Sequence, residues 1–472
     1  MTTKLSNPTM RAVAAGAILI SLSGCATFSK DGGLDAVSSL TAERTGQDVR
    51  LPKTSADSAA IQDELNQLLK QPLSADSAVR VALINNRGLR ASLAELGVAE
   101  ADLVQAGRMA NPGFSFSRLS GGGETEIERS VMFDLVGLVT IPIRRDIESR
   151  RFESAKLVAA TEAVRLAADT RKAYFNAVAA VQSARYAEQV REAAGASAEL
   201  AQRMAKVGNL SALDQAREQA FSAEASTQLA RARHNATAAR EQLARLMGVW
   251  GENTAFQLPD KLPDLPAVPR EASNIESLAM QQRLDVRLAK LSTESTARAL
   301  GLTKATGVIN VLDAGYVNSS KSGAHRENGY EIELALPIFD WGGARVAKAE
   351  ALYMQSVHRT ANTAINARSQ VREAYSAYRT SYDVARQHRD ELVPLRKKIS
   401  EESLLRYNGM LMSVFELLAD ARAQIGGVNA AIDAQREFWI AETDLQAALS
   451  GSGGSSIAMA STAAPAEAAA EH

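Results

Sequence analysis

Residues 330–345 read YEIELALPIFDWGGAR, and this stretch decides the fold. Its first half alternates between apolar residues and others: Tyr330, Ile332, Leu334 and Leu336 on one side, and Glu331, Glu333 and Ala335 on the other. A period of two is typical of a strand with one apolar and one polar face. Pro337 lacks a backbone donor, so regular strand pairing should end there. Gly342 and Gly343 follow, and the Ala-, Lys- and Glu-rich sequence after them favours a long helix.

The same order of elements occurs twice. Residues 131–146, VMFDLVGLVTIPIRRD, predict a return strand that ends at Pro142 and a helix that then continues to Gly208. That helix of roughly 64 residues would be about 95 Å long. Each copy predicts a helix, two strands, a very long helix and a returning helix, so the expected fold is mixed α/β and mainly α. In the second copy the long helix is expected over residues 344–407, with a kink at Pro394.

Proline marks the boundary between the copies. Four prolines fall within residues 258–272, which predicts a linker between a first repeat at 73–257 and a second at 273–449. Residues 25–72 lead into the first repeat, with a polar, irregular tether expected up to residue 53 and Ser74 placed to cap the first helix. Residues 450–472 are Gly-, Ser- and Ala-rich and are expected to be disordered. In the second repeat, strands are expected at 308–317 and 329–336 around a loop at 318–328.

Residues 1–24 are expected to be a signal peptide. Lys4 and Arg11 precede an apolar run at 12–22, far shorter than the ~20 residues that a membrane-spanning helix needs. The sequence LSGC at 22–25 resembles the bacterial lipobox, which implies cleavage before Cys25, acylation of that residue and an outer-membrane destination. The alternative is an uncleaved signal, or a buried cysteine in a short helix.

The strand count predicts an oligomer if the strands enter a membrane. Only closed β-barrels satisfy their backbone groups in lipid, and single-chain bacterial barrels have at least eight strands. Four strands in one chain therefore require two chains for eight strands or three for twelve. Glu331 and Glu333 would then face the lumen, because lipid-facing charges cost energy, ~2–4 kcal/mol for Lys or Arg at mid-membrane and less for Glu. The alternative is a one-sided strand in a soluble sheet.

The order of motifs over residues 73–449 resembles the TolC-like outer-membrane efflux family. The segments that carry the resemblance are LSADSAVRVALINNRGLRA at 73–91, VGNLSALDQAR at 207–217, LPIFDWGGAR at 336–345 and RYNGMLMSVFELLADAR at 406–422. The resemblance implies a homotrimer with a 12-stranded outer-membrane barrel, continued by a helical tunnel in the periplasm. It also implies a passive export duct that works with a periplasmic adaptor and an inner-membrane transporter. The first junction departs from the pattern, since Arg144 and Arg145 stand where Phe339 and Asp340 stand in the second copy.

Two tight turns are expected at the far ends of the long helices. Gly208-Asn209 and Asn408-Gly409 suit such turns because both residue types tolerate positive φ. In the family these turns form the periplasmic tip, so the resemblance implies a part in adaptor docking. A plain helical-hairpin turn is the alternative.

Charged residues near the turns are candidates for a tunnel gate. The resemblance implies acidic residues that constrict the tunnel after the second turn; Glu416 matches the first such position after a one-residue insertion, while Ala419 takes the second. Asp214 lies near the first turn, and Arg203 and Arg406 precede the two turns, where pairing with neighbours would hold the tip shut. The alternative for these residues is an ordinary solvated helix surface.

Composition offers nothing in favour of other functions. With 53 basic and 54 acidic residues, the charge gives no argument for nucleic-acid binding. Cys25 is the one cysteine, the five histidines are scattered, and neither a nucleophile–base pair nor a phosphate loop is recognisable. We therefore expect a protein without catalysis, cofactor or metal. The alternative to an export duct is a periplasmic lipoprotein of long coiled coils without a pore, which would not need the strands.

Overall fold

The computed structural model describes residues 27–452 apart from 53, 272–273 and 307–310, so the expected signal peptide, Cys25 and residues 453–472 of the tail lie outside it. The chain divides into two compact units. Of the described residues, the sheet unit takes 27–40, Arg90–Ala160 and Val286–Ala364. The hairpin unit takes Thr41–Leu89, Thr161–Asp285 and 365–452.

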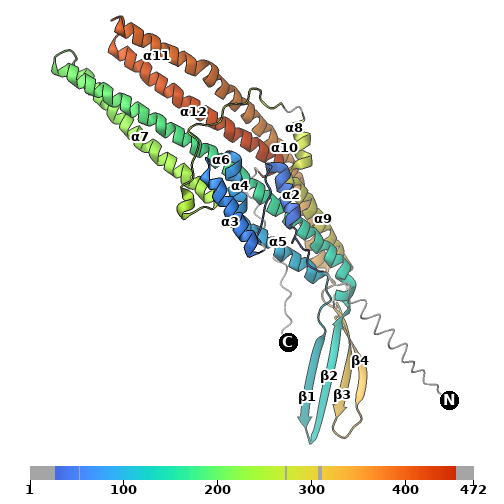
Figure 1. Cartoon of the computed structure of the whole chain (residues 1–472). Helices are drawn as coiled ribbons and strands as arrows, with labels where there is room; N and C mark the ends of the chain where they lie inside the picture. The colour runs from blue at the N-terminus through green and yellow to red at the C-terminus, as the bar shows by residue number, and fades with distance from the viewer. Residues whose placement is uncertain (1–26, 53, 272–273, 307–310, 453–472) are drawn as a thin grey trace. The chain divides into compact units, whose positions relative to one another are not determined.

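The sheet unit contains one four-stranded antiparallel sheet in the order β1-β2-β3-β4 (Figure 1). Its strands are β1 (Gly113–Gly121), β2 (Glu124–Asp134), β3 (Leu312–Lys321) and β4 (Glu327–Leu334). Each repeat supplies one hairpin, and the repeats join where β2 pairs with β3. β3 continues to Lys321, although a loop was expected from residue 318. Asn318 stays in the strand because its side chain donates to the side chain of Asn328, its partner on β4, at 2.7 Å.

The first strand-to-helix junction lies earlier than expected. β2 ends at Asp134 and α6 (Leu135–Lys206) begins at the next residue, so Pro142 stands inside the helix and does not mark the junction. Asp134 explains the early start, because its carboxylate accepts the Gly137 backbone N–H at 2.6 Å, as a helix cap does. Arg144 donates to the Gly137 carbonyl at 2.6 Å, within the turn that the proline disturbs.

The second junction differs from the first. Residues 335–342 follow β4 without helix, and α10 (Gly343–Gln387) begins after Gly342, which has a φ of +77°. Pro337 and Gly342 therefore lie between strand and helix, and Gly343 is the first residue of the helix. The long second-repeat helix is interrupted by a π-helical segment, η3 (His388–Leu392), before α11 (Val393–Asn408). This segment accommodates Pro394, which lies in the first turn of α11.

The expected N-terminal tether is partly helical. α2 (Leu34–Thr45) follows Gly32 and Gly33, and Val37 on it is fully buried. The segment is docked in the sheet unit, since the Ser29 backbone N–H donates to Glu100 of α5 (Arg87–Ala106) at 2.5 Å. A Cβ at Gly33 would lie 2.9 Å from the Phe152 ring, so the packing there leaves no room for a side chain. Composition concealed this docking because the buried partners are distant in sequence.

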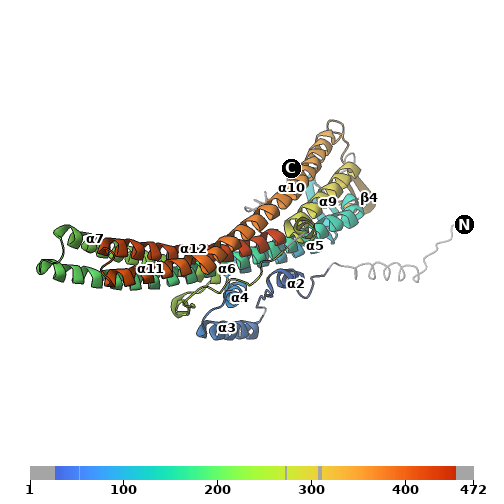
Figure 2. The same ribbon diagram turned by 90° about the horizontal axis from the view of Figure 1, so that it is seen from above.

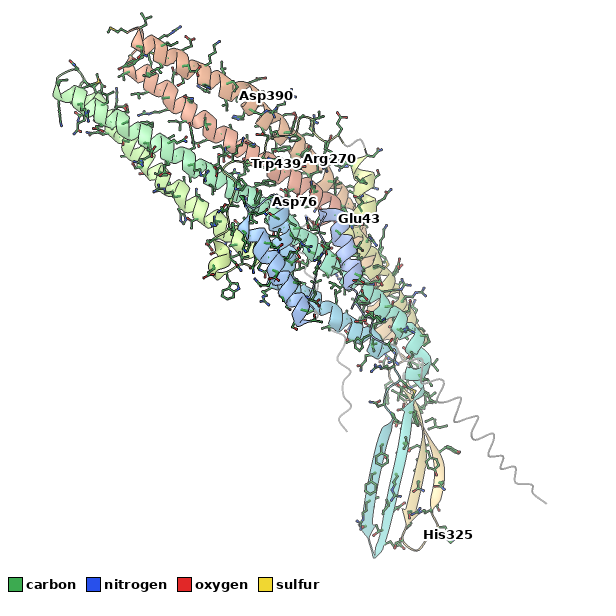
Figure 3. All side chains as sticks on the ribbon, viewed as in Figure 1. Glu43, Asp76, Arg270, His325, Asp390 and Trp439 are labelled. Carbon is green, nitrogen blue, oxygen red and sulfur yellow. The ribbon has the colours of Figure 1, made fainter. Side chains whose placement is uncertain are left out.

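The hairpin unit consists of paired helices. α3 (Ser55–Lys70), α4 (Ala75–Asn85), α7 (Ala212–Met247), α8 (Ile275–Gln282), α11 and α12 (Val414–Ser450) belong to it, together with the later parts of α6 and α10. Figures 1 and 2 show α6 alongside α7 and α11 alongside α12. Apolar clusters fill the unit, and Trp439 (Figure 3) packs against the two larger ones. Its ring lies 5.2 Å from Phe175 and 5.1 Å from Phe438.

Each repeat has a helix break of the same geometry. Asn86 ends α4 with φ −62° and ψ 123°, and Arg283 ends α8 with φ −64° and ψ 125°. Both donate to the last carbonyls of the returning helix of their own repeat: Asn86 to Leu246 at 2.9 Å, and Arg283 to Ala448 at 2.8 Å. The repeats thus share the contact but use an amide in one and a buried guanidinium in the other. α9 (Leu284–Ala305) follows the second break.

The proline-rich linker is bound to the helices. Proline cannot donate a backbone hydrogen bond, so the segment offers mostly carbonyl acceptors. Gln435 and Trp439 of α12 donate to the Pro263 carbonyl at 2.6 and 3.0 Å, and the Tyr382 hydroxyl of α10 donates to the Pro266 carbonyl at 3.1 Å. The linker therefore ties α10 to α12 within the hairpin unit.

Candidate functional site

The pairing register gives the sheet two chemically different faces. Directly opposed residues share a face in an antiparallel sheet, and successive residues alternate. One face, the apolar face, carries Phe114, Phe116, Val131, Phe133, Tyr316, Tyr330, Ile332 and Leu334. The other, the acidic face, carries eight carboxylates: Glu124, Glu126, Glu128, Asp134, Asp313, Glu327, Glu331 and Glu333. Lys321 is the one basic side chain on the strands of the acidic face, 3.4 Å from Glu124.

Glu331 and Glu333 lie together on the acidic face, opposite Gly315 and Asp313. Asp134 pairs with Asp313 from the other side, so three carboxylates from adjacent strands stand in one row. Like charges directly opposite each other cost stability, on the order of 0.2–1 kcal/mol per pair. A sheet selected for stability alone would not retain this row. On the apolar face, Tyr316 and Tyr330 instead make an edge-to-face contact at 6.3 Å.

The loop at the sheet end remote from the helices joins β3 to β4 and contains His325 (Figure 3). Arg118 and Arg129 lie on the apolar face toward this end. Arg129 contacts the Phe116 ring at 5.9 Å and donates to Asn318 at 3.3 Å. The apolar face therefore becomes polar before the loops, as it would at the edge of an apolar medium.

The two helical turns have the same hydrogen-bonding pattern. After α6, Gly208 N–H donates to the Ala205 carbonyl at 3.0 Å, and Asn209 N–H to Met204 at 2.9 Å. After α11, Met410 N–H donates to Tyr407 at 3.0 Å, and Leu411 N–H to Arg406 at 2.9 Å. These pairs are those of the Schellman motif, whose C′ residue is left-handed. Gly208 and Met410 are therefore equivalent C′ residues.

This equivalence corrects the expectation for the second turn. Gly409 has a φ of −80°, so neither it nor Asn408, the last residue of α11, provides the positive φ. Met410 provides it, with a φ of 58°, and its side chain is 94% exposed. Gly208 has a φ of +78°, as the sequence predicts for a glycine in such a turn.

Asp214 and Glu416 occupy matching positions, each three residues after the serine that caps its helix. The Asp214 backbone N–H donates to the Ser211 hydroxyl at 3.2 Å, and that of Glu416 donates to the Ser413 hydroxyl at 3.3 Å. The Glu416 carboxylate accepts the Ser413 backbone N–H at 3.0 Å, and this bond together with the Ser413 hydroxyl lowers the pKa of Glu416. The Glu416 carboxylate thus completes a capping box, whereas the Asp214 carboxylate accepts the Ser211 hydroxyl at 2.6 Å. Neither of these local contacts requires a gate.

The candidate arginines differ from each other. Arg203 forms an ion pair with Glu199 on the same helix. Arg406 has no ion pair among the residues that the structure describes, and its carbonyl accepts the Leu411 N–H. Neither arginine is bonded to Asp214 or Glu416 in those residues.

Two side-chain contacts between paired helices were not predicted from the sequence. Ser197 donates to Glu218 at 2.7 Å across the first hairpin, and Ser403 donates to Asp420 at 2.5 Å across the second. Glu218 and Asp420 each lie seven residues after the capping serine, Ser211 or Ser413. Aligning the two copies on those serines would have identified the pair.

Other kinds of site were not found in the described part of the chain. No group of three or more His, Cys, Asp or Glu residues there is arranged to hold a metal ion. Among the helices described, none combines the length and apolar character needed to cross a membrane.

No protein-family model matches the sequence, and neither does any curated protein. Several solved structures match. An outer-membrane channel of Campylobacter jejuni, CmeC, has a TM-score of 0.70 at 17% identity, over 88% of this chain and 92% of that one. A membrane protein of Pseudomonas aeruginosa has a TM-score of 0.67 at 20% identity, over 82% and 93%. The open state of the Neisseria gonorrhoeae outer-membrane channel MtrE has a TM-score of 0.63 at 17% identity, over 83% and 89%. The chain therefore has the fold of outer-membrane channels, which confirms the TolC-like resemblance at the level of the fold.

Proposed function

We propose that this protein is the outer-membrane duct of an export system, a passive channel without catalytic activity. The observation that carries the proposal is the two-faced sheet, apolar on one side and acidic on the other, in a chain with the fold of outer-membrane channels. An apolar outside and a polar inside are what a transmembrane barrel requires of its strands.

The duct is a homotrimer in this proposal. One sheet of four strands has two edges, β1 and β4, and is too narrow to close on itself, because about eight strands are needed before the interior of a barrel has room for side chains. Three copies joined edge to edge supply twelve strands, an even number within the range of bacterial barrels. Acylation of Cys25 adds a lipid anchor to each copy.

The acidic face lines the passage. Eight carboxylates against one lysine in each chain give the lumen a negative potential, which concentrates cations and repels anions. Turning this face outward would place the carboxylates in lipid and the aromatic residues in water. Glu331 and Glu333 therefore stand among the residues that set the ion preference of the duct.

The turns at Gly208-Asn209 and Asn408-Gly409 form the periplasmic tip, where a periplasmic adaptor docks and connects the duct to an inner-membrane transporter. Exposed Val207 and Leu411 beside the turns support a partner contact there. Asp214, Glu416, Arg203 and Arg406 are the candidates for closing the passage.

Two measurements on the full-length, membrane-extracted protein test the proposal. Gel electrophoresis with and without heating should show a heat-labile trimer, and planar bilayers should show single-channel conductance that favours cations. A monomer without conductance would instead support a periplasmic lipoprotein of coiled coils and would refute the duct.

A further inference from the structure

The chain contains two Asn-Gly steps, and they lie in different local structures. Asn328-Gly329 is part of β4, whereas Asn408-Gly409 lies where α11 ends, at the turn before α12 (Figure 1). An Asn-Gly step loses its side-chain amide readily, because glycine has no Cβ to keep its backbone nitrogen away from the preceding side chain. Both asparagines are exposed, so exposure alone does not distinguish them.

The Asn328 step is held in place by the sheet. Its side-chain oxygen accepts a hydrogen bond from Asn318 at 2.7 Å, and the backbones of Asn328 and Gly329 are paired with β3. A reaction between the Gly329 nitrogen and the Asn328 side chain would therefore require local separation of the strands.

The Asn408 side chain is not held in this way. Within the described part of the chain it makes no hydrogen bond, and Asn408 is the last residue of α11, where helices fray. The Gly409 N–H donates to the Leu405 carbonyl at 3.0 Å, so this bond must open before the nitrogen can react. Met410 favours that opening, because its φ of 58° places a side chain in the left-handed region, where residues other than glycine are strained.

We propose that Asn408 is a site of spontaneous deamidation whose rate is set by the strained turn. The Gly409 backbone nitrogen loses its proton to water and attacks the side-chain carbonyl carbon of Asn408, and the new C–N bond closes a succinimide ring. The Cγ–Nδ2 bond breaks, and the amide nitrogen takes up a proton and leaves as ammonia. Water then opens the ring at either carbonyl to give aspartate or isoaspartate, so a water is consumed for each ammonia released. This inference does not depend on the proposed function.

The product changes the chemistry of the turn but not the fold. A carboxylate at the end of α11 adds a negative charge at the negative end of the helix dipole. Isoaspartate also adds a methylene to the backbone between α11 and α12. Because the Asn408 side chain is exposed, neither change disturbs a packed core. The surface of this turn therefore gains negative charge as the protein ages.

Mass spectrometry of the full-length protein tests the proposal. Asn209 serves as a further control, because it lies exposed in the equivalent first turn but precedes a leucine. Trypsin releases the three asparagines in separate peptides, residues 207–217, 327–345 and 407–422. The folded protein, without partner proteins, is kept at mildly alkaline pH in water labelled with heavy oxygen, which marks any deamidation that precedes digestion. We expect conversion to be severalfold faster at Asn408 than at Asn328 or Asn209, and similar at the two Asn-Gly steps in denaturant.

Two substitutions separate the reaction from the strain. Gly409→Ala should suppress the conversion, because a Cβ hinders the attacking nitrogen. The turn accepts this change, since Gly409 has a φ of −80° and a Cβ there would lie 3.5 Å from the nearest atoms. Met410→Gly keeps the reacting pair and relieves the strain, so conversion at Asn408 should slow by up to about fivefold while Asn328 stays unchanged.

Each part of the proposal has its own contrary result. Conversion at Asn408 that is no faster than at Asn328 in the folded protein overturns the site. Conversion that persists in Gly409→Ala overturns the succinimide route. Conversion at Asn408 that is fast and unchanged in Met410→Gly keeps the site but overturns the control of its rate by the strained turn.

Discussion

The turn at Met410 allows one prediction to be worked out from backbone geometry. A side chain in the left-handed region costs roughly 1–2 kcal/mol, whereas a glycine costs about 0.4–1 kcal/mol in added freedom of the unfolded chain. Met410→Gly should therefore stabilise the α11–α12 turn by about 1 kcal/mol or slightly less. Gly208→Ala places a side chain at the equivalent position of the first turn and should destabilise it by about the same amount. The two substitutions are opposite tests of one structural equivalence.

Hydrogen exchange followed by mass spectrometry on the full-length protein measures both effects locally. A change of about 1 kcal/mol alters the opening equilibrium roughly fivefold, so the amides beside Met410 should exchange up to about fivefold more slowly in Met410→Gly. The amides beside Gly208 should exchange faster by a similar factor in Gly208→Ala. Each variant serves as the control for the other hairpin. Faster exchange at the second turn in Met410→Gly would refute the assignment of Met410 as the C′ residue.

Three further predictions concern the lumen, the helix break and the helix cap. Glu333→Leu should reduce the cation preference measured from reversal potentials without loss of trimer; lost assembly with unchanged preference would contradict its lumen position. Arg283→Leu should destabilise the protein in denaturant by about 3–5 kcal/mol, because it removes one partner of a buried ion pair, whose other partner is Asp285 at 2.6 Å, together with the donor to the Ala448 carbonyl. A loss below about 1 kcal/mol would contradict this. The pKa of Glu416 is lowered in the folded chain, so its capping contribution is present above the unfolded pKa and is lost as the pH falls below the ordinary value of 4.5. On acidification, amides at the start of α12 should therefore lose protection from hydrogen exchange in the native protein. The same loss in Glu416→Gln would exclude this carboxylate as the cause.

The features that depend on local chemistry were predictable from the sequence. Ser74 caps α4 and Ser413 caps α12, because a hydroxyl before a helix satisfies a free backbone N–H whatever the rest of the chain does. The alternation at Glu331 and Glu333 likewise fixed the two faces of β4 before any partner strand was known. The tight turn at Gly208 belongs to the same group.

The features that depend on distant partners were not predictable. The length of β3 follows from the pairing of Asn318 with Asn328, and polarity alone had suggested a loop. The docking of the segment before α2 depends on Glu100, some seventy residues away. The start of α6 was predicted too late for a different reason: Asp134 was a recognisable cap, but Pro142, eight residues later, was taken as the boundary. At the second turn, the sequence favoured Gly409 for the positive φ because glycine is the usual C′ residue, but the C′ residue is Met410.

The order of strands in the sheet has a consequence for how copies meet. Within the described chain, β1 and β4 are the two edges, so a contact in which β1 of one copy pairs with β4 of the next joins different surfaces of the two partners. Such head-to-tail contacts form a ring only when the rotation between neighbours divides a full circle, and otherwise continue into an open filament. Strand twist and tilt set that rotation. The curvature of a single four-stranded sheet would then determine both the number of subunits and whether the assembly ends at all.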